Sequence, residues 1–210
     1  MDKDIKKVNP EHLDVFRELG NIGAGNATTS LAKMLDKRMD MSIPRAQLVP
    51  FNQITDILHG PETIVVGVMI AMSGDLKGFI LLVMEFQDAV EMTGILTGNK
   101  LQNATIDDLS EMDLSAIEEV ANILIGSYLS AISSMTQLTI MPSVPDLVID
   151  MAGAIMSVPV IEYGKIGDEV LLLETQFNDE GQAMAGHFFL IPDLDSYYVL
   201  IRSLGIDVDG

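Results

Sequence analysis

The stretch Asp14-Val-Phe-Arg-Glu18-Leu-Gly-Asn21-Ile-Gly-Ala-Gly25 lies in the middle of a helix that is predicted to begin at Asn9-Pro10. Asn is favoured at the N-cap of a helix and Pro at its first position. At about 100° per residue, the polar or small positions of this stretch fall within an arc of roughly 60°; they are Asp14, Glu18, Asn21 and Gly25. The opposite side is apolar and comprises Leu13, Phe16, Leu19, Ala27, Leu31 and Met34. The polar stripe is therefore predicted to face away from the core.

The same spacing occurs again 101 residues later, as the step from Asn21 to Asn122 shows. The second polar stripe comprises Ser115, Glu119, Asn122 and Gly126. Its apolar counterpart comprises Leu114, Ile117, Val120, Leu124 and Tyr128. A proline also follows each Asn at the same distance, as Pro44 and Pro145. The chain therefore contains an internal repeat.

Asn and Gly are poor residues for the interior of a helix, and each costs roughly 0.5 to 1 kcal/mol relative to Ala. A solvated helix surface does not need them twice at the same positions. A binding surface does, because Gly lets another backbone approach, Asn offers both donors and an acceptor, and Glu carries a fixed negative charge. The two stripes are therefore interpreted as binding surfaces.

The repeated pattern of Asp or Ser, Glu, Asn and a later Pro resembles that of the CheC, CheX and FliY family of chemotaxis phosphatases. The likeness extends from the segment at Asn21 to the Ile191-Pro192-Asp193 stretch. Within the family the chain most resembles the CheC type, because CheX-type proteins carry one intact motif and FliY-type proteins append a flagellar-switch domain. The resemblance implies an enzyme that hydrolyses the aspartyl phosphate of the receiver protein CheY.

The resemblance also implies roles for the stripe residues. Asn21 and Asn122 would orient the attacking water, and Glu18 and Glu119 would anchor the receiver. The remaining stripe positions would help to dock it; these are Asp14, Gly25, Ser115 and Gly126. The implied enzyme needs no cofactor of its own, because the receiver supplies the Mg²⁺ at its phosphorylation site.

Two alternatives remain open. The chain could be a non-catalytic regulatory module that binds the receptor deamidase CheD, a partner that the resemblance also implies, and the two roles could coexist. The predicted CheD contact is the segment from Leu147 to Met156, with Asp150 as its candidate residue. The chain could also be a component associated with the flagellar switch, which is disfavoured because no further domain follows Gly210.

Composition excludes several function classes. The 31 acidic and 12 basic residues give a net charge of -19, which disfavours binding to nucleic acid or to anionic lipid. There is no cysteine, so thiolate metal sites and cysteine nucleophiles are excluded. The three histidines have no spacing typical of metal ligands, and His187 is interpreted as a packed residue. Without a signal peptide or a long apolar run, a soluble cytoplasmic protein is expected.

The first repeat, over about residues 9–98, is predicted to form a helix, a strand, a short helix, a hairpin and a final helix, in that order. After the first helix, which ends near Lys37-Arg38, the expected elements are a strand at Met41–Val49 on a sheet edge, a helical turn at Phe51–Leu58, hairpin strands at Thr63–Met72 and Leu76–Phe86, and a helix at Gln87–Leu96. A polar connector follows at residues 99–112.

The second repeat, over about residues 112–205, has the same order. The expected elements are a helix capped by Asp113 and ending near Met135, an irregular or edge strand at Leu138–Ile149, a weak helix at Ala152–Val160, hairpin strands at Glu169–Phe177 and Ala183–Ile191, and a final helix from Asp193 to Leu204. Neither half can bury all its apolar faces alone. We therefore predict an α+β fold in which residues 1–210 form one domain, with the repeats related by a pseudo-twofold axis.

Overall fold

A computed structural model describes residues 10–35, 40–98, 104–163, 169–179 and 182–206. The first half contains α1 (Pro10–Leu35), β1 (Asp40–Pro50), a 3-10 turn (Phe51–Gln53), α2 (Ile54–Ile57), β2 (Ile64–Gly74), β3 (Gly78–Glu85) and α3 (Phe86–Thr97). After a second 3-10 turn (Ile106–Asp108) come α4 (Glu111–Thr136), β4 (Ile140–Pro142), β5 (Asp146–Met151), α5 (Ala152–Tyr163), β6 (Glu169–Asp179), β7 (Gln182–Pro192) and α6 (Leu194–Ser203).

The strands form one antiparallel sheet in the order β1-β6-β7-β3-β2, and β4 and β5 both pair with the outer side of β2. β1, from the first half of the chain, pairs along its length with β6 from the second. β5, from the second half, pairs with β2 from the first. Each half therefore supplies an edge strand to the hairpin of the other half.

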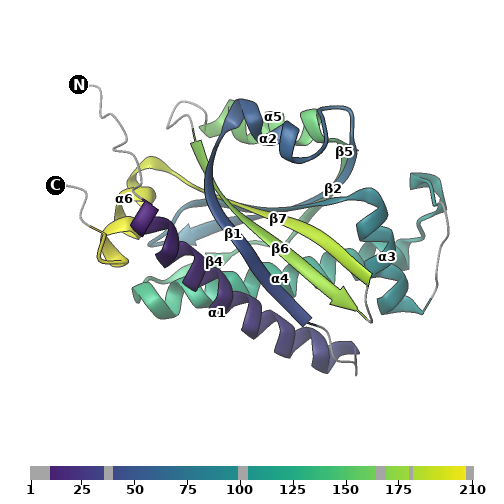
Figure 1. Ribbon diagram of the computed structural model, residues 1–210, viewed down its shortest axis with the longest axis horizontal. Coiled ribbons are helices and arrows are strands. Elements are labelled where there is room, and N and C mark those ends of the chain that lie inside the picture. The colour runs from purple at the N-terminus through teal and green to yellow at the C-terminus, as the bar shows by residue number, and fades with distance from the viewer. Residues whose placement is uncertain (1–9, 36–39, 99–103, 164–168, 180–181, 207–210) are drawn as a thin grey trace.

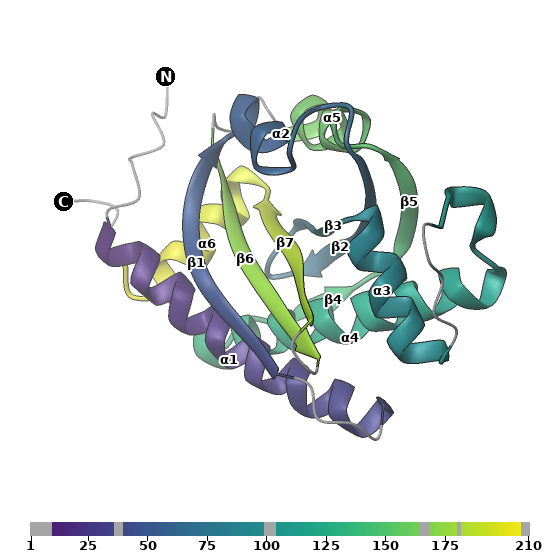
Figure 2. The same cartoon turned by 45° about the vertical axis from the view of Figure 1, so that its right-hand side comes forward.

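Helices cover both faces of this sheet (Figures 1 and 2). The long helices α1 and α4 lie side by side in opposite directions on one face, and the short helices α2 and α5 cover the other. Along β2, Val66, Val68 and Ile70 join the core under α1 and α4, whereas Val65 joins the core under α2 and α5. The strand is apolar on both faces because both are buried.

The core under α1 and α4 is the larger of the two and draws on both halves of the chain. Its centre contains Tyr128 of α4, whose ring centroid lies 4.4 Å from that of Phe188 of β7. On the other face, Phe189 is fully buried and belongs to the core that includes residues of α2 and α5. Alternate residues of β7 thus fill opposite cores.

The predicted α+β class is confirmed, and most expected elements occur within a few residues of their predicted bounds. The turn at His59-Gly60 ends α2, and both residues have positive φ angles of 62° and 118°. Asp193 is the N-cap of α6, as predicted, and its carboxylate accepts a hydrogen bond from the backbone N–H of Ser196. Asn9, Lys37-Arg38 and the first five residues of the connector, 99–103, lie outside the described residues.

Three expectations were wrong in detail. The N-cap of α4 is Ser110, and Asp113 is its partner three residues later in a capping box, with its Oδ2 2.9 Å from the Ser110 backbone nitrogen. The strand expected at Leu138–Ile149 is irregular and at a sheet edge, as predicted, but it is divided into β4 and β5 by a break at residues 143–145. Met34 is 40% exposed, because it lies in the last turn of α1.

Both edges of the sheet are irregular next to the repeated prolines. The register between β1 and β6 shifts between Ser42 and Arg45, the stretch that contains Pro44. Pro145 lies in the break between β4 and β5. Proline cannot donate to a ladder, so both positions suit an edge. Among the described residues, no helix is long and apolar enough to cross a membrane.

We expect residues 1–100, expressed alone, to be unfolded or aggregated. The fragment would leave β1 without β6, β3 without β7 and α1 without α4, which exposes apolar surface and unpaired strand edges. Circular dichroism and thermal melting, with the full chain as control, test this expectation. A sharp melting transition of the fragment would contradict it.

Candidate functional site: polar stripes on two paired helices

The first predicted stripe lies on the solvent side of α1. Asp14, Glu18, Asn21 and Gly25 are all exposed. Phe16 and Leu19, between them in sequence, are buried against the sheet. Helical periodicity therefore places the two sets on opposite sides, and the carboxylates and the amide are open to a partner.

The second predicted stripe lies on the solvent side of α4. Ser115, Glu119 and Asn122 are exposed, and Gly126 is half-buried. Val120 and Leu124 are buried beneath them. Each helix thus presents a Glu and, three residues later, an Asn to solvent.

Close contact between Gly23 and Tyr128 fixes how α1 packs on α4. A Cβ added to Gly23 would lie 2.8 Å from Cδ1 of Tyr128 and 3.1 Å from its Cα. Tyr128 is fully buried, and its hydroxyl lies 3.2 Å from the hydroxyl of Thr175 on β6. Burial raises the pKa of Tyr128 above its ordinary value, so the phenol stays protonated. Tyr128 thereby joins both stripe-bearing helices to the sheet.

The glycines within the stripes have different surroundings. A Cβ added to Gly25 or to Gly126 would have no neighbour within 4 Å. These glycines are therefore not needed for packing within the chain. The open space above them is compatible with close approach by a partner.

The charged surroundings of the two stripes differ. In α1, Nη2 of Arg17 lies 3.2 Å from Oδ1 of Asp14. Arg17 is also one turn before Asn21 on the same side of the helix. The corresponding position of α4 is Glu118, next to Glu119. The repeated motif does not include this position, so its spacing gives no sign of the reversal of charge beside the two Asn residues.

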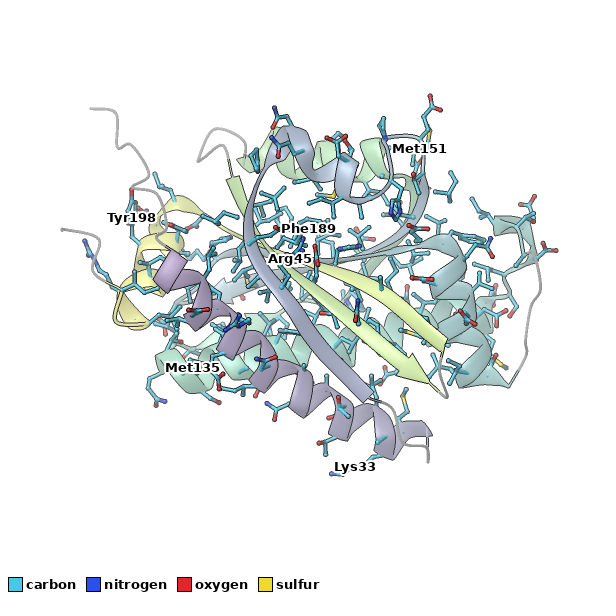
Figure 3. The ribbon with its side chains drawn as sticks, in the orientation of Figure 1. Lys33, Arg45, Met135, Met151, Phe189 and Tyr198 are labelled. Carbon is cyan, nitrogen blue, oxygen red and sulfur yellow. The ribbon has the colours of Figure 1, made fainter. Side chains whose placement is uncertain are left out.

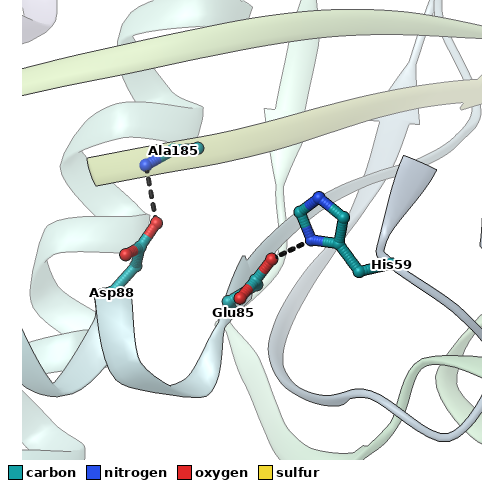
Figure 4. A network of polar contacts seen from close by, with 4 residues as sticks. All are labelled: His59, Glu85, Asp88 and Ala185. Atoms are coloured by element: carbon teal, nitrogen blue, oxygen red, sulfur yellow. Dashed lines mark hydrogen bonds and ion pairs between the residues drawn. The ribbon is translucent and has the colours of Figure 1, made fainter. Parts of the chain in front are cut away.

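A second polar cluster lies where β7 meets the start of α3 (Figure 4). His59 Nδ1 contacts Glu85 Oε1, and Asp88 Oδ2 accepts a hydrogen bond of 2.7 Å from the backbone N–H of Ala185. Burial raises the pKa of the Asp88 carboxyl above its ordinary value, although the hydrogen bond from Ala185 opposes this. The Asp88 contact joins α3 to β7, and the His59 contact joins the turn after α2 to the end of β3. Neither contact involves a stripe residue.

His187 lies near the same cluster and is packed, as the sequence indicated. Its Nδ1 is buried without a hydrogen-bond partner among the described residues. Burial lowers the pKa of His187, which favours the neutral ring. In the described part of the chain, no group of three or more His, Asp or Glu side chains is placed to hold a metal ion.

The candidate CheD contact, Leu147 to Met156, lies away from the stripes and spans the edge strand β5 and the start of α5 (Figure 1). Its α5 part is largely unavailable, because Ala152, Ile155 and Met156 are buried. On β5, Asp150 is exposed, as are Val148 and Met151, each 44% exposed. Figure 3 shows Met151 at the outer margin of the sheet. β5 pairs with β2 on one side, and no described strand pairs with its other side. Apolar side chains and an unpaired edge are therefore available together.

The stripes can bind and orient, but they bring little reactive chemistry. An exposed Asn amide can donate to one group while its carbonyl accepts from another, which suits the alignment of a water molecule. An adjacent Glu can pair with a cation of a docked partner. Covalent catalysis needs a nucleophile beside a base, and the stripes contain no histidine or lysine to activate Ser115. The stripes therefore offer groups for binding and orientation, and no activated nucleophile.

Comparison with known proteins gives a consistent set of relatives. The CheC-like family matches residues 11–47 and 112–149, which contain both stripes. The chain is 36% identical over 202 residues to the CheY-P phosphatase CheC of Bacillus subtilis (strain 168), covering 94% of this chain and 96% of the relative. It is 27% identical over 132 residues to the flagellar motor switch phosphatase FliY of the same organism, covering 63% of this chain and 34% of FliY. The crystal structure of Thermotoga maritima FliY shares the fold, with a TM-score of 0.73, 22% identity, and coverage of 93% of this chain and 98% of that one.

The contrast between Gly23 and Gly25 gives a test of the helix packing. Gly25→Ala should raise the free energy of unfolding by about 1 kcal/mol, because Ala is the better helix former and meets no neighbour. Gly23→Ala gains the same preference but forces a methyl group against Tyr128, which costs about 1 to 3 kcal/mol. Denaturant unfolding of both variants measures the difference. Equal stabilisation of the two variants would show that the helices are not held in close contact at Gly23.

Proposed function

Because this chain belongs to the CheC-like family, we propose that it is a phosphatase that hydrolyses the aspartyl phosphate of a CheY-type receiver protein. The observation that carries the proposal is the repeated Glu and Asn, exposed at the same spacing on α1 and α4. The named activity of the CheC relative supports it, since the two chains align over nearly their whole lengths.

In the proposed mechanism, Asn21 and Asn122 each enter the phosphorylation site of a docked receiver. The side-chain amide holds a water in line with the bond between phosphorus and the aspartyl oxygen. The water oxygen attacks phosphorus, the aspartyl carboxylate leaves, and inorganic phosphate is formed. Phosphoryl transfer depends chiefly on alignment and charge stabilisation, so one orienting amide can accelerate it without a covalent intermediate.

Glu18 and Glu119 hold the receiver in the proposed complex. Each lies three residues before its Asn on the same exposed side, where a carboxylate can pair with a lysine at the receiver's phosphorylation site. Asp14 and Ser115 extend the contact by a further turn. Gly25 and Gly126 leave room for the receiver backbone, because neither has a neighbour above it. The receiver, with its own Mg²⁺, supplies the charge stabilisation that these side chains cannot.

We also propose that the sites arise from two repeats related by a pseudo-twofold axis between β3 and β7. The strand order supports this, because β3 and β7, β2 and β6, and β5 and β1 take corresponding places on the two sides of that axis. In this account the chain is a single domain, since each half completes the sheet of the other. Two equivalent helices then present two sites.

Replacement of both Asn residues by Ala should abolish receiver dephosphorylation, whereas neither single replacement should. Loss of a positioning amide typically costs on the order of 10² to 10³ in rate. Both side chains are exposed, and Ala is the better helix former, so the variants should fold as well as the parent. The measurement is phosphate release from a phosphorylated receiver for Asn21→Ala, Asn122→Ala and the double variant.

Circular dichroism and melting of the same proteins serve as the folding control. Asn26→Ala is a matched control, because Asn26 is exposed on α1 outside the stripe and should leave the rate unchanged. A folded double variant that releases phosphate at the parental rate would refute the catalytic role of the two amides.

We further propose that the chain binds the receptor deamidase CheD through the free edge of β5. The supporting observation is the exposure of Val148, Asp150 and Met151 on a strand whose outer side has no described strand partner. This surface is separate from both stripes, so receiver and deamidase could bind together. If the chain were instead a non-catalytic regulatory module, it would use the β5 surface and neither stripe.

Asp150→Lys should weaken deamidase binding at least tenfold, because it reverses a charge at the centre of the proposed contact while leaving both stripes intact. Titration calorimetry with purified deamidase measures this. Asp195→Lys makes the same charge change at an exposed position of α6 and should have no effect. Unchanged affinity of Asp150→Lys would remove β5 from the proposal.

A further inference from the structure

On the basis of the proposed function, we infer that the residue four positions before each Asn makes the two sites select different receiver surfaces. Arg17 holds this position in α1, and Glu118 holds it in α4. The α4 site should require a receiver whose docking face carries positive charge beyond the one cation that Glu119 can pair with. The α1 site should accept a receiver without that extra charge.

Arg17 lies where it can influence a partner docked at Asn21. The two residues are one turn apart on the same side of α1, and the Arg17 side chain is 54% exposed. Its guanidinium also pairs with Asp14, whose side chain is 71% exposed. The pair offsets one of the two negative charges of the α1 stripe, and no described Lys or Arg forms an ion pair with Glu18.

Glu118 has the opposite effect in α4. It is partly exposed, one turn before Asn122, and it adds a second carboxylate directly beside Glu119. α4 contains no Lys or Arg, so no cation of its own helix offsets these charges. With four acidic and no basic residues, α4 has a formal charge of -4. With three acidic residues, Arg17 and Lys33, α1 has a formal charge of -1.

Lys33 adds to this difference at the far end of α1. It is exposed in the last turn, and Figure 3 shows it at the end of the helix, away from the sheet. Charges at the rim of an interface act mainly on the encounter between partners and on its salt dependence. Neither Arg17 nor Glu118 belongs to the pair that holds the water and the receiver lysine. The charge difference should therefore change KM and leave kcat intact.

Two single-site proteins separate the contributions. Asn122→Ala leaves only the α1 site active, and Asn21→Ala leaves only the α4 site. In the first protein, Arg17→Glu gives α1 the negative charge that α4 carries four positions before its Asn. In the second, Glu118→Arg gives α4 the positive charge that α1 carries at the same place. Dephosphorylation of a CheY-type receiver, phosphorylated with acetyl phosphate, is measured for all four proteins at about 0.05 M and about 0.5 M salt, a range over which screening strengthens markedly.

In the α4-only protein, which carries Asn21→Ala, we expect KM to rise about threefold or more between low and high salt. In the α1-only protein, which carries Asn122→Ala, KM should rise less than twofold. Glu118→Arg should raise KM at low salt and remove most of its salt dependence. Arg17→Glu should make the KM of the α1-only protein depend on salt. In each case kcat should change less than twofold. Glu111→Gln, at the first residue of α4 and distant from Asn122, is the matched control and should leave KM within twofold.

Equal salt dependence of the two single-site proteins, or charge reversals that alter kcat and not KM, would overturn the inference. These failures differ from failure of the proposed function, in which the parent protein does not dephosphorylate the receiver, one single-site protein shows no turnover, or the double Asn variant keeps the parental rate.

Discussion

The structure depends on how closely α1 and α4 pack. Gly23 lets α1 approach the ring of Tyr128, and Tyr128 in turn stacks near Phe188 and reaches Thr175 through its hydroxyl. One buried side chain thus joins two helices and two strands. Because the apolar side of each helix is held against the sheet, the opposite side must face solvent. That side carries the Glu and Asn residues, so their exposure follows from the packing beneath them.

The sheet imposes a second constraint. β1 and β5 pair with the hairpin of the opposite half, and the core under the two long helices draws on both halves. The edges where these exchanged strands lie are broken next to Pro44 and Pro145, which limits further strand addition. The exposed apolar residues of β5 remain the exception. They form an exposed surface that is separate from the stripes.

The sequence alone predicted the two long helices, their exposed stripes and the edge strands, because helical periodicity and proline are local signals. It could not predict that Gly23 packs on Tyr128, since that contact joins residues that are distant in the chain. The N-cap of α4 was misplaced because Ser110 and Asp113 both favour helix starts, and only the geometry shows which one precedes the first helical residue. The opposite charges of Arg17 and Glu118 are visible in the sequence. Their relation to the Asn residues becomes clear when each is placed on the exposed side of its helix.

The central claim is that the exposed Asn of each stripe reaches the phosphorylation site of a docked receiver. A crystal structure of this protein with a CheY-type receiver carrying beryllium fluoride in place of phosphate tests it most directly. The account predicts a receiver on α1 and another on α4, with the amides of Asn21 and Asn122 each about 3 Å from the position of a water in line with the beryllium–oxygen bond. A receiver seated elsewhere, with both amides remote from its phosphorylation site, would contradict the account.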